Sequence, residues 1–153
     1  VIDFLRMQFG EIADIALIPG ETPRPAGPIP GDVQMSFSLR MESGLPVAVH
    51  ALDFGAYREV GLDVWGTEGR LTIFQEGLKI HHYPRGENRS TSGEFEIATD
   101  SGGEIASTVG TAFYEIFESL SQGLDGLAPL TCPIRTAAAS EAWVDRILGA
   151  VTN

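Results

Sequence analysis

Hydrophobic and polar residues alternate without a break through residues 33–41, and this stretch gives the clearest strand signal in the chain. The apolar positions are Val33, Met35, Phe37, Leu39 and Met41. A period of two predicts a β-strand with one buried face. The sequence Glu-Ser-Gly at 42–44 favours a turn, and residues 46–54 return as a second strand, so a hairpin is predicted.

Other short segments predict strands before and after this hairpin. They are residues 11–18, 59–65, 70–74, 78–83 and 94–98. Turn signals at 66–69 and 76–77 join the middle three. Residues 19–30 hold five of the nine prolines and predict an irregular loop, and residues 84–93 predict a polar loop.

Apolar residues recur with a helical spacing of three and four in residues 1–9, 104–122 and 133–151. Pro133 suits the first position of the last helix, with Thr131 or Cys132 as its N-cap. A run of strands followed by two helices predicts an α+β fold. We expect an open-faced, mostly antiparallel sheet with helices packed on one face and the other face available for oligomerisation.

The length of 153 residues fits one domain, because an average domain uses about 150. We therefore expect residues 1–153 to form a single domain. The first helical pattern is already under way at Val1, without the N-cap residue that would bind its first N–H groups. This start predicts that the chain was cut from a longer one.

Acidic residues exceed basic ones by 21 to 10, a net charge of −11. Such a surface repels phosphate backbones and anionic lipid, so we expect neither nucleic acid nor membrane as a partner. No segment reaches the roughly 18 to 20 consecutive apolar residues of a membrane helix. The single cysteine, Cys132, fits a reducing cytoplasm, and no Cys/His spacing suits a metal.

The candidate catalytic groups are a histidine and three carboxylates. His50 could be a general acid or a contact to a substrate hydroxyl in a cleft, or a hydrogen-bonded histidine of the sheet. Asp3, Asp53 and Asp63 lie within apolar patterns, where a carboxylate needs a partner. The candidate partners are Arg40 and Arg58. A small hydrolase or isomerase that uses His50 with Asp53 or Asp63 is therefore one hypothesis.

The remaining reactive residues give weaker signals. His81 and His82 are neighbours on a predicted strand, so they point to opposite faces and cannot share one metal. Cys132 precedes a proline at a helix start, which is typical of a small structural residue rather than a nucleophile. Sequence motifs for binding phosphate groups, G-x-G-x-x-G and G-x-x-x-x-G-K, do not occur.

Large aromatic residues fall out of phase with the aliphatic ones in the predicted strands. They are Trp65 and Phe74, joined by Phe54 or Tyr83. If the helices cover one face, the opposite face displays these side chains. A monomer rarely exposes such a patch, so this face is expected to meet another subunit or another domain.

Three segments in this order resemble the glucose–fructose oxidoreductase / inositol dehydrogenase (Gfo/Idh/MocA) family. VIDFLRMQFGEI resembles the segment after the family's catalytic histidine, H-x-x-D-x-x-x-x-x-x-G-x-I, where Asp3, Gly10 and Ile12 fit. LDVWGTEGRLTI resembles its strand, G-T-x-G turn and strand. AFYEIFESLSQGLDGLAPL, followed by an alanine-rich helix, resembles its closing pair of helices, and the likeness spans nearly the whole chain.

The resemblance implies the C-terminal domain of a two-domain enzyme. In that family an N-terminal Rossmann domain binds NAD or NADP, and the C-terminal α+β domain lines the substrate cleft and forms subunit contacts. Hydride transfer to or from a sugar, cyclitol or related polyol is assisted by a lysine of an E-K-P motif and a histidine. This chain departs from the pattern because it has no Rossmann fingerprint and its one lysine, Lys79, is not in E-K-P. The histidine would stand immediately before Val1.

The resemblance carries over few site residues. Asp3 is expected to orient its helix or the neighbourhood of that histidine. Tyr57 and Arg58 lie in the loop that often contacts substrate in relatives; Tyr57 would bind a sugar hydroxyl and Arg58 a carboxylate or phosphate, or both are surface residues at a strand end. The fragment alone is not expected to be catalytic. A non-catalytic module for sheet-mediated association is the alternative.

Overall fold

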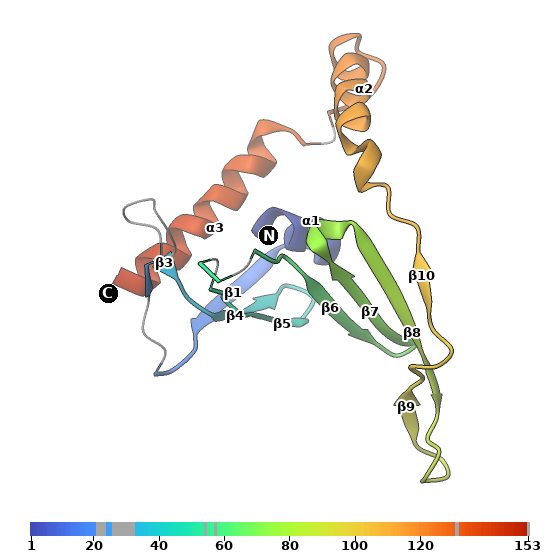
Figure 1. The fold of residues 1–153 in the computed structure, drawn as a ribbon. Coiled ribbons are helices and arrows are strands. Elements are labelled where there is room, and N and C mark those ends of the chain that lie inside the picture. The colour runs from blue at the N-terminus through green and yellow to red at the C-terminus, as the bar shows by residue number, and fades with distance from the viewer. Residues whose placement is uncertain (21–23, 26–32, 54, 57, 131, 153) are drawn as a thin grey trace. The chain divides into compact units, whose positions relative to one another are not determined.

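A computed structural model describes residues 1–153 apart from 21–23, 26–32, 54, 57, 131 and 153 (Figure 1). Within these ranges about a third of the chain is helical and a third is in strands, all of which pair antiparallel. The α+β class and the mostly antiparallel sheet are thereby confirmed. The chain divides into two compact units, the first made of residues 1–58 and 129–153 and the second of residues 59–128.

The first unit builds a three-stranded sheet and two helices. Its elements are α1 (Ile2–Phe9), β1 (Ile12–Leu17), β2 (Arg24–Pro25), β3 (Val33–Gln34), β4 (Phe37–Met41), β5 (Pro46–Val49) and α3 (Ile134–Thr152). The sheet has the order β1-β4-β5, and β2 pairs with β3 separately. Leu39 stands opposite Ile15 on one side and Val47 on the other, so all three side chains share a face.

Helix α1 ends where the sequence pattern predicts. Gly10 follows it with a φ of 88°, a left-handed conformation that glycine adopts without a steric penalty. Its N–H donates to the carbonyl of Arg6 at 3.0 Å. At the other end Val1 provides no side-chain cap, as expected from its residue type.

The core of the first unit lies where α1, α3 and the sheet meet. Helix α1 packs on α3, and α3 contacts β1. The buried hydrophobic residues are Ile2, Leu5, Ile12, Leu39, Met41 and Ile147. All six belong to this unit, and burial of large aliphatic side chains stabilises it by about 1.5–3 kcal/mol each.

The second unit is a curled antiparallel sheet followed by a helix. Its elements are β6 (Leu62–Gly66), β7 (Gly69–Phe74), the 3-10 turn η1 (Gln75–Gly77), β8 (Lys79–Glu87), β9 (Phe95–Ile97), β10 (Gly103–Ile105), the 3-10 turn η2 (Val109–Thr111) and α2 (Ala112–Leu124). The strand order is β10-β8-β7-β6, and β9 pairs with the far end of β8. Only Gly69 is buried among the described residues of this unit.

Several predicted elements have different bounds in the structure. The strand expected at 33–41 is interrupted, because the side chains of Gln34 and Ser36 turn inward and bind the backbone of Leu52 and Ala51. The strand expected at 46–54 ends at Val49. In the proline-rich loop, β2 is a two-residue strand, and most of residues 19–30 lie outside the described ranges.

The second unit also departs from the predicted pattern in two places. The polar loop expected at 84–93 begins as strand, because β8 continues to Glu87 and pairs with β9. The helix expected at 104–122 begins only at Ala112, because residues 103–105 form β10 beside β8 and Gly110 lies in η2. The prediction of helix for residues 104–111 was therefore wrong.

Candidate functional site

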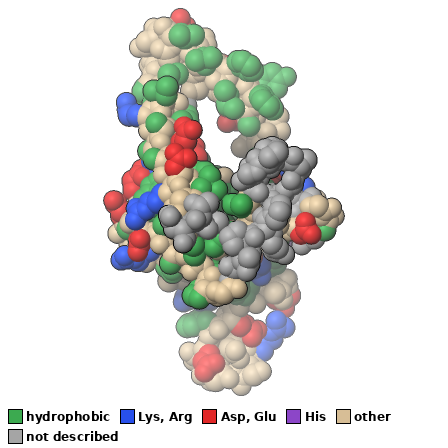
Figure 2. Space-filling model, turned by 90° about the vertical axis from the view of Figure 1, so that its left-hand side faces the viewer, with side chains coloured by type: hydrophobic (Ala, Val, Ile, Leu, Met, Phe, Trp, Pro, Cys, Tyr) green, Lys and Arg blue, Asp and Glu red, His purple; other side chains and the backbone are tan. Residues whose placement is uncertain are grey.

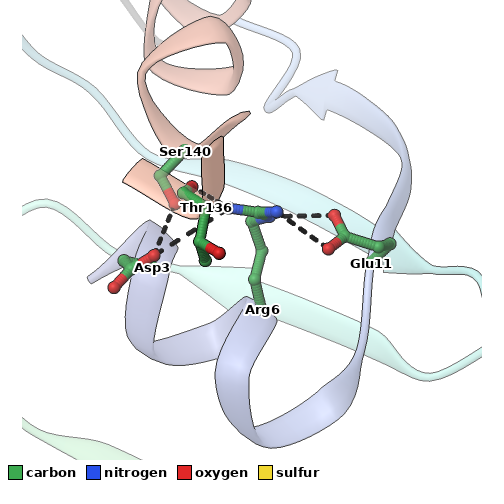
Figure 3. A network of polar contacts seen from close by, with 5 residues as sticks. All are labelled: Asp3, Arg6, Glu11, Thr136 and Ser140. Atoms are coloured by element: carbon green, nitrogen blue, oxygen red, sulfur yellow. Dashed lines mark hydrogen bonds and ion pairs between the residues drawn. The ribbon is translucent and has the colours of Figure 1, made fainter. Parts of the chain in front are cut away.

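Arg6 is the centre of a polar network inside the first unit (Figure 3). Its side chain projects from α1 and is 5% exposed. Nε and Nη2 donate to the two carboxylate oxygens of Glu11 at 2.9 and 2.8 Å, a bidentate pair. Nη1 donates to the Thr136 carbonyl at 2.9 Å and to Ser140 Oγ at 2.6 Å.

Asp3 joins the same network from one turn earlier on α1. Its Oδ1 accepts a hydrogen bond from Ser140 Oγ at 2.7 Å and lies 3.9 Å from Arg6 Nη1. Its carboxylate is therefore held by a hydroxyl of α3 and a buried cation. The structure thus places Asp3 where it can orient its helix, and its effect on a neighbouring catalytic group stays a prediction.

The charges of this network stabilise one another. The hydrogen bond from Arg6 lowers the pKa of Glu11 against the opposing effect of burial, and the same hydrogen bond raises the pKa of Arg6. Both groups are consequently ionised at neutral pH, and the buried guanidinium is compensated. Sequence reasoning missed Arg6 and Glu11; the available signal was an arginine three residues after an aspartate on a predicted helix face.

The loop after β5 carries the other candidates of the first unit. His50 and Asp53 are exposed and lie beyond the end of β5. Asp53 Oδ1 accepts a hydrogen bond from the Gly55 N–H at 2.9 Å, so this carboxylate shapes a turn. Arg58 is exposed, whereas Tyr57 lies outside the described residues, as does Phe54.

The structure gives Arg40 and Asp63 partners other than the expected ones. Arg40 lies 3.7 Å from Asp14, not from one of the three candidate carboxylates. Asp63 pairs with Arg70, whose Nη2 and Nε lie 2.8 and 2.9 Å from Oδ1. The strand register explains why Asp63 pairs with Arg70. The two residues are diagonal neighbours on the paired strands β6 and β7, and their side chains lie on the same side of the sheet.

The β6-β7-β8 register sorts side chains onto two different faces. Directly paired residues point to the same side, and successive residues alternate. One side, which we call the aromatic face, carries Asp63, Trp65, Arg70, Thr72, Phe74, Lys79, His81, Tyr83 and Glu104. The other side, the aliphatic face, carries Leu62, Val64, Leu71, Ile73, Ile80, His82, Pro84 and Ile105.

Polar and ring contacts order the aromatic face. Thr72 Oγ1 donates to Asp63 Oδ1 at 2.7 Å, beside the Arg70 pair. The Arg70 guanidinium lies 4.9 Å from the centre of the Trp65 ring and 5.8 Å from that of Tyr83. Trp65 is nevertheless 65% exposed, and the ring of His81 lies 4.4 Å from that of Tyr83. Trp65, Phe74 and Tyr83 thus share one side, as the alternation predicts.

His81 and His82 lie on opposite faces of β8, also as expected from their adjacency. Each is partly exposed. In the described ranges, no three histidine, cysteine, aspartate or glutamate side chains gather in a way that could hold a metal ion. The helices described here are all too short or too polar to cross a membrane.

Comparisons with known proteins add no neighbour to this picture. No family model matches the chain, and neither curated proteins nor solved structures give a significant match.

Proposed function

We propose that this chain is the substrate-side and oligomerisation domain of an NAD(P)-dependent oxidoreductase that acts on a sugar, cyclitol or related polyol in the cytoplasm. The observation that carries the proposal is the two-sided antiparallel sheet of the second unit, joined in one chain to the α1–α3 pair. Both features accord with the three family-like segments, in the same order along the sequence. The proposal assigns the chain to the Gfo/Idh/MocA family by its C-terminal half.

The dinucleotide would bind outside this chain. A pyrophosphate is held at the start of a helix that follows a strand of a parallel β-α-β unit. Every strand pair in the described ranges is antiparallel, and the sequence has no G-x-G-x-x-G. The residues present do not fit the cofactor, so an N-terminal Rossmann domain of the same parent protein would supply that site.

The contribution of this chain would be to position substrate and neighbouring elements. Arg6 fixes α1 to α3. Asp3 lies on the first turn of α1 and is also bound to α3, through Ser140. A histidine directly before Val1 would be held near this rigid turn. Arg58 and Tyr57 are proposed to contact substrate, Arg58 through a charged hydrogen bond and Tyr57 through its hydroxyl.

The coding sequence upstream of Val1 tests this assignment first. We expect a G-x-G-x-x-G fingerprint, an E-K-P motif and a histidine at the junction. A stop or an unrelated domain there would contradict the oxidoreductase assignment. It would leave the second candidate, a non-catalytic association module, which the exposed apolar residues of α2 also favour.

The hydrolase or isomerase hypothesis has less support from the geometry. Asp53 Oδ1 is engaged by the Gly55 N–H, and Asp63 Oδ1 by Arg70 and Thr72. Both carboxylates therefore already have hydrogen-bond donors other than His50. The direct test is the His50→Ala substitution in this chain. It should abolish hydrolase or isomerase activity if His50 is the catalytic group.

A further inference from the structure

We propose that two copies of this chain exchange α2, so that the apolar side of each helix packs on the aliphatic face of the other copy. The inference deepens the oligomerisation part of the proposed function and rests on it. Its physical basis is that the apolar side chains of α2 are exposed and those of the aliphatic face are only partly buried.

Helix α2 is the first of these surfaces. None of its 13 residues is buried. Its large apolar side chains recur at helical spacing, which gathers them on one side of the helix. They are Phe113 (76% exposed), Ile116 (60%), Phe117 (68%), Leu120 (44%) and Leu124 (80%). Hydrophobic side chains are exposed at the top of Figure 2, the level of α2 in Figure 1. A helix of this length is marginal in water alone, so α2 needs a partner.

The opposite side of α2 is polar and forms its own contacts. Gln122 Nε2 donates to Glu118 Oε1 at 2.9 Å, one helical turn away. Thr111 Oγ1 lies 3.1 Å from Glu115 Oε1 at the start of the helix. This side is suited to solvent, which leaves the apolar side as the docking surface.

The aliphatic face is the complementary surface. Its strand residues Leu62, Val64, Leu71, Ile73 and Ile80 are all partly exposed, and Ile105 is 46% exposed. The second unit buries no large side chain among its described residues, in contrast to the six buried hydrophobic residues of the first. A flat aliphatic sheet face is the usual partner of an apolar helix side.

The connection between β10 and α2 favours exchange between chains over folding back in one chain. Only residues 106–111 separate Ile105 from Ala112. Ser107 Oγ donates to the Gly77 carbonyl at 2.5 Å, and the Val109 N–H donates to Ser107 Oγ at 3.2 Å. The short segment is therefore tied to η1 at the end of the sheet, and short constrained hinges promote the swapping of an element between protomers.

The area available matches that of a stable dimer. A fully exposed aromatic side chain has a surface area of about 200 Å², so the exposed side chains on the apolar side of α2 have a combined area of roughly 500 Å². A reciprocal exchange covers two helix sides and two sheet faces, on the order of 2,000 Å² in total. Specific interfaces bury about 1,200–2,000 Å². The exchange is also symmetric, so it closes at two copies rather than growing into a filament.

Cross-linking between differently tagged chains tests the exchange. Each chain carries Cys132→Ser, because the native cysteine is exposed. One chain then receives Phe117→Cys on α2 and the other Ile73→Cys on the aliphatic face. The two are co-expressed and oxidised, and the products are separated without reductant. The matched control replaces Ile73→Cys by Thr72→Cys, the neighbouring position on the aromatic face. Circular dichroism verifies folding, and Leu120→Cys replaces Phe117→Cys if that variant does not fold.

The expected result is a disulfide between tagged chains for positions 117 and 73, at least tenfold more abundant than for 117 and 72. A dimer in light scattering without the 117–73 product overturns the exchange and leaves sheet-mediated oligomerisation standing. A monomer at tens of micromolar overturns the exchange and the oligomerisation together. A double variant on one chain that closes its disulfide within that chain shows folding back and likewise overturns the exchange. Nicotinamide turnover by the complete protein is independent of all three outcomes.

Discussion

Arg6 and Ser140 lie 134 positions apart in the sequence, yet Nη1 of Arg6 donates to the Ser140 hydroxyl oxygen at 2.6 Å. Ser140 Oγ in turn donates a hydrogen bond to Asp3 Oδ1 at 2.7 Å, so one hydroxyl links two residues of α1 to α3. With the bidentate contact to Glu11, this buried cation fixes α1, the approach to β1 and α3 as one piece. The stability of the first unit is therefore expected to depend more on the Arg6 side chain than on any of its exposed ion pairs.

Removal of Arg6 should destabilise the chain. Arg6→Met keeps the volume of the stem but leaves Glu11 and the Thr136 carbonyl without the hydrogen bonds that Arg6 donates, which is expected to cost about 2 kcal/mol. The midpoint of thermal unfolding should fall by about 4–8 °C. Circular dichroism measures this. Arg40→Met, which breaks an exposed contact to Asp14, is the control and should change stability by less than about 0.5 kcal/mol. Equal effects of both substitutions would contradict the role given to Arg6.

The network also predicts a specific pH dependence. Arg6 lowers the pKa of Glu11 in the folded state below its ordinary value of 4.5, so the unfolded chain binds this proton more readily. The stabilisation is therefore complete above that ordinary value and is lost as pH falls through the lower folded pKa. Melting curves between neutral and acidic pH should show Glu11→Gln less stable than the native chain at neutral pH, with the gap closing in acid.

A second carboxylate variant makes this measurement specific. Glu42→Gln, in the exposed turn between β4 and β5, should follow the native chain over the whole range. A gap between native chain and Glu11→Gln that stays constant with pH would contradict the linkage.

The β6–β7 turn depends on one of its two glycines. Gly69 has a φ of 145°, and a Cβ there would collide with the carbonyl oxygen of Tyr83 on the neighbouring strand. Gly69→Ala should therefore destabilise the sheet by about 2 kcal/mol or more, because backbone must move. Gly66→Ala, at the other end of the same turn, meets only the Gly69 carbonyl oxygen at 3.9 Å and should cost less than about 1 kcal/mol. Denaturant titration compares the two, and the reverse order would refute this explanation.

The sequence allowed the helix ends and hairpins to be predicted where local signals were sufficient. Gly10 ends α1, and the Gly66–Gly69 turn joins β6 to β7, because glycine chemistry acts within a few residues. The break at Gln34 and Ser36 was not predictable from alternation, since it depends on backbone groups of residues 51 and 52. Long-range pairing likewise decided β10, a strand that exists because β8 offers a free edge to residues 103–105.

The candidate site was predicted only in part for a similar reason. Asp3 was recognised as a carboxylate in an apolar pattern, but its partners come from α3 at the other end of the chain. Asp63 was recognised too, whereas its partner Arg70 follows from the strand register rather than from sequence proximity. Residue type thus identified the acids, whereas the hydroxyl bound to Asp3 and the cation bound to Asp63 are set by tertiary structure and strand register.

The proposed substrate contacts predict a kinetic effect in the complete protein. Arg58→Ala should lower kcat/KM about tenfold or more, because a charged hydrogen bond contributes about 1.5–3 kcal/mol. Tyr57→Phe should give a smaller decrease. Arg89→Ala, an exposed arginine paired with Glu96, is the control and should leave kcat/KM at the native value. Unchanged kinetics in Arg58→Ala and Tyr57→Phe would remove both residues from the site.

Nicotinamide absorbance during turnover shows directly whether the complete protein is an NAD(P)-dependent polyol oxidoreductase. The complete protein, including whatever precedes Val1, is supplied with NAD or NADP and a panel of sugars and cyclitols, and the 153-residue chain is assayed beside it. We predict reduction of the cofactor by the complete protein with at least one polyol and none by the chain alone. A complete protein that bound no dinucleotide and reduced none with any polyol of the panel would contradict the oxidoreductase assignment.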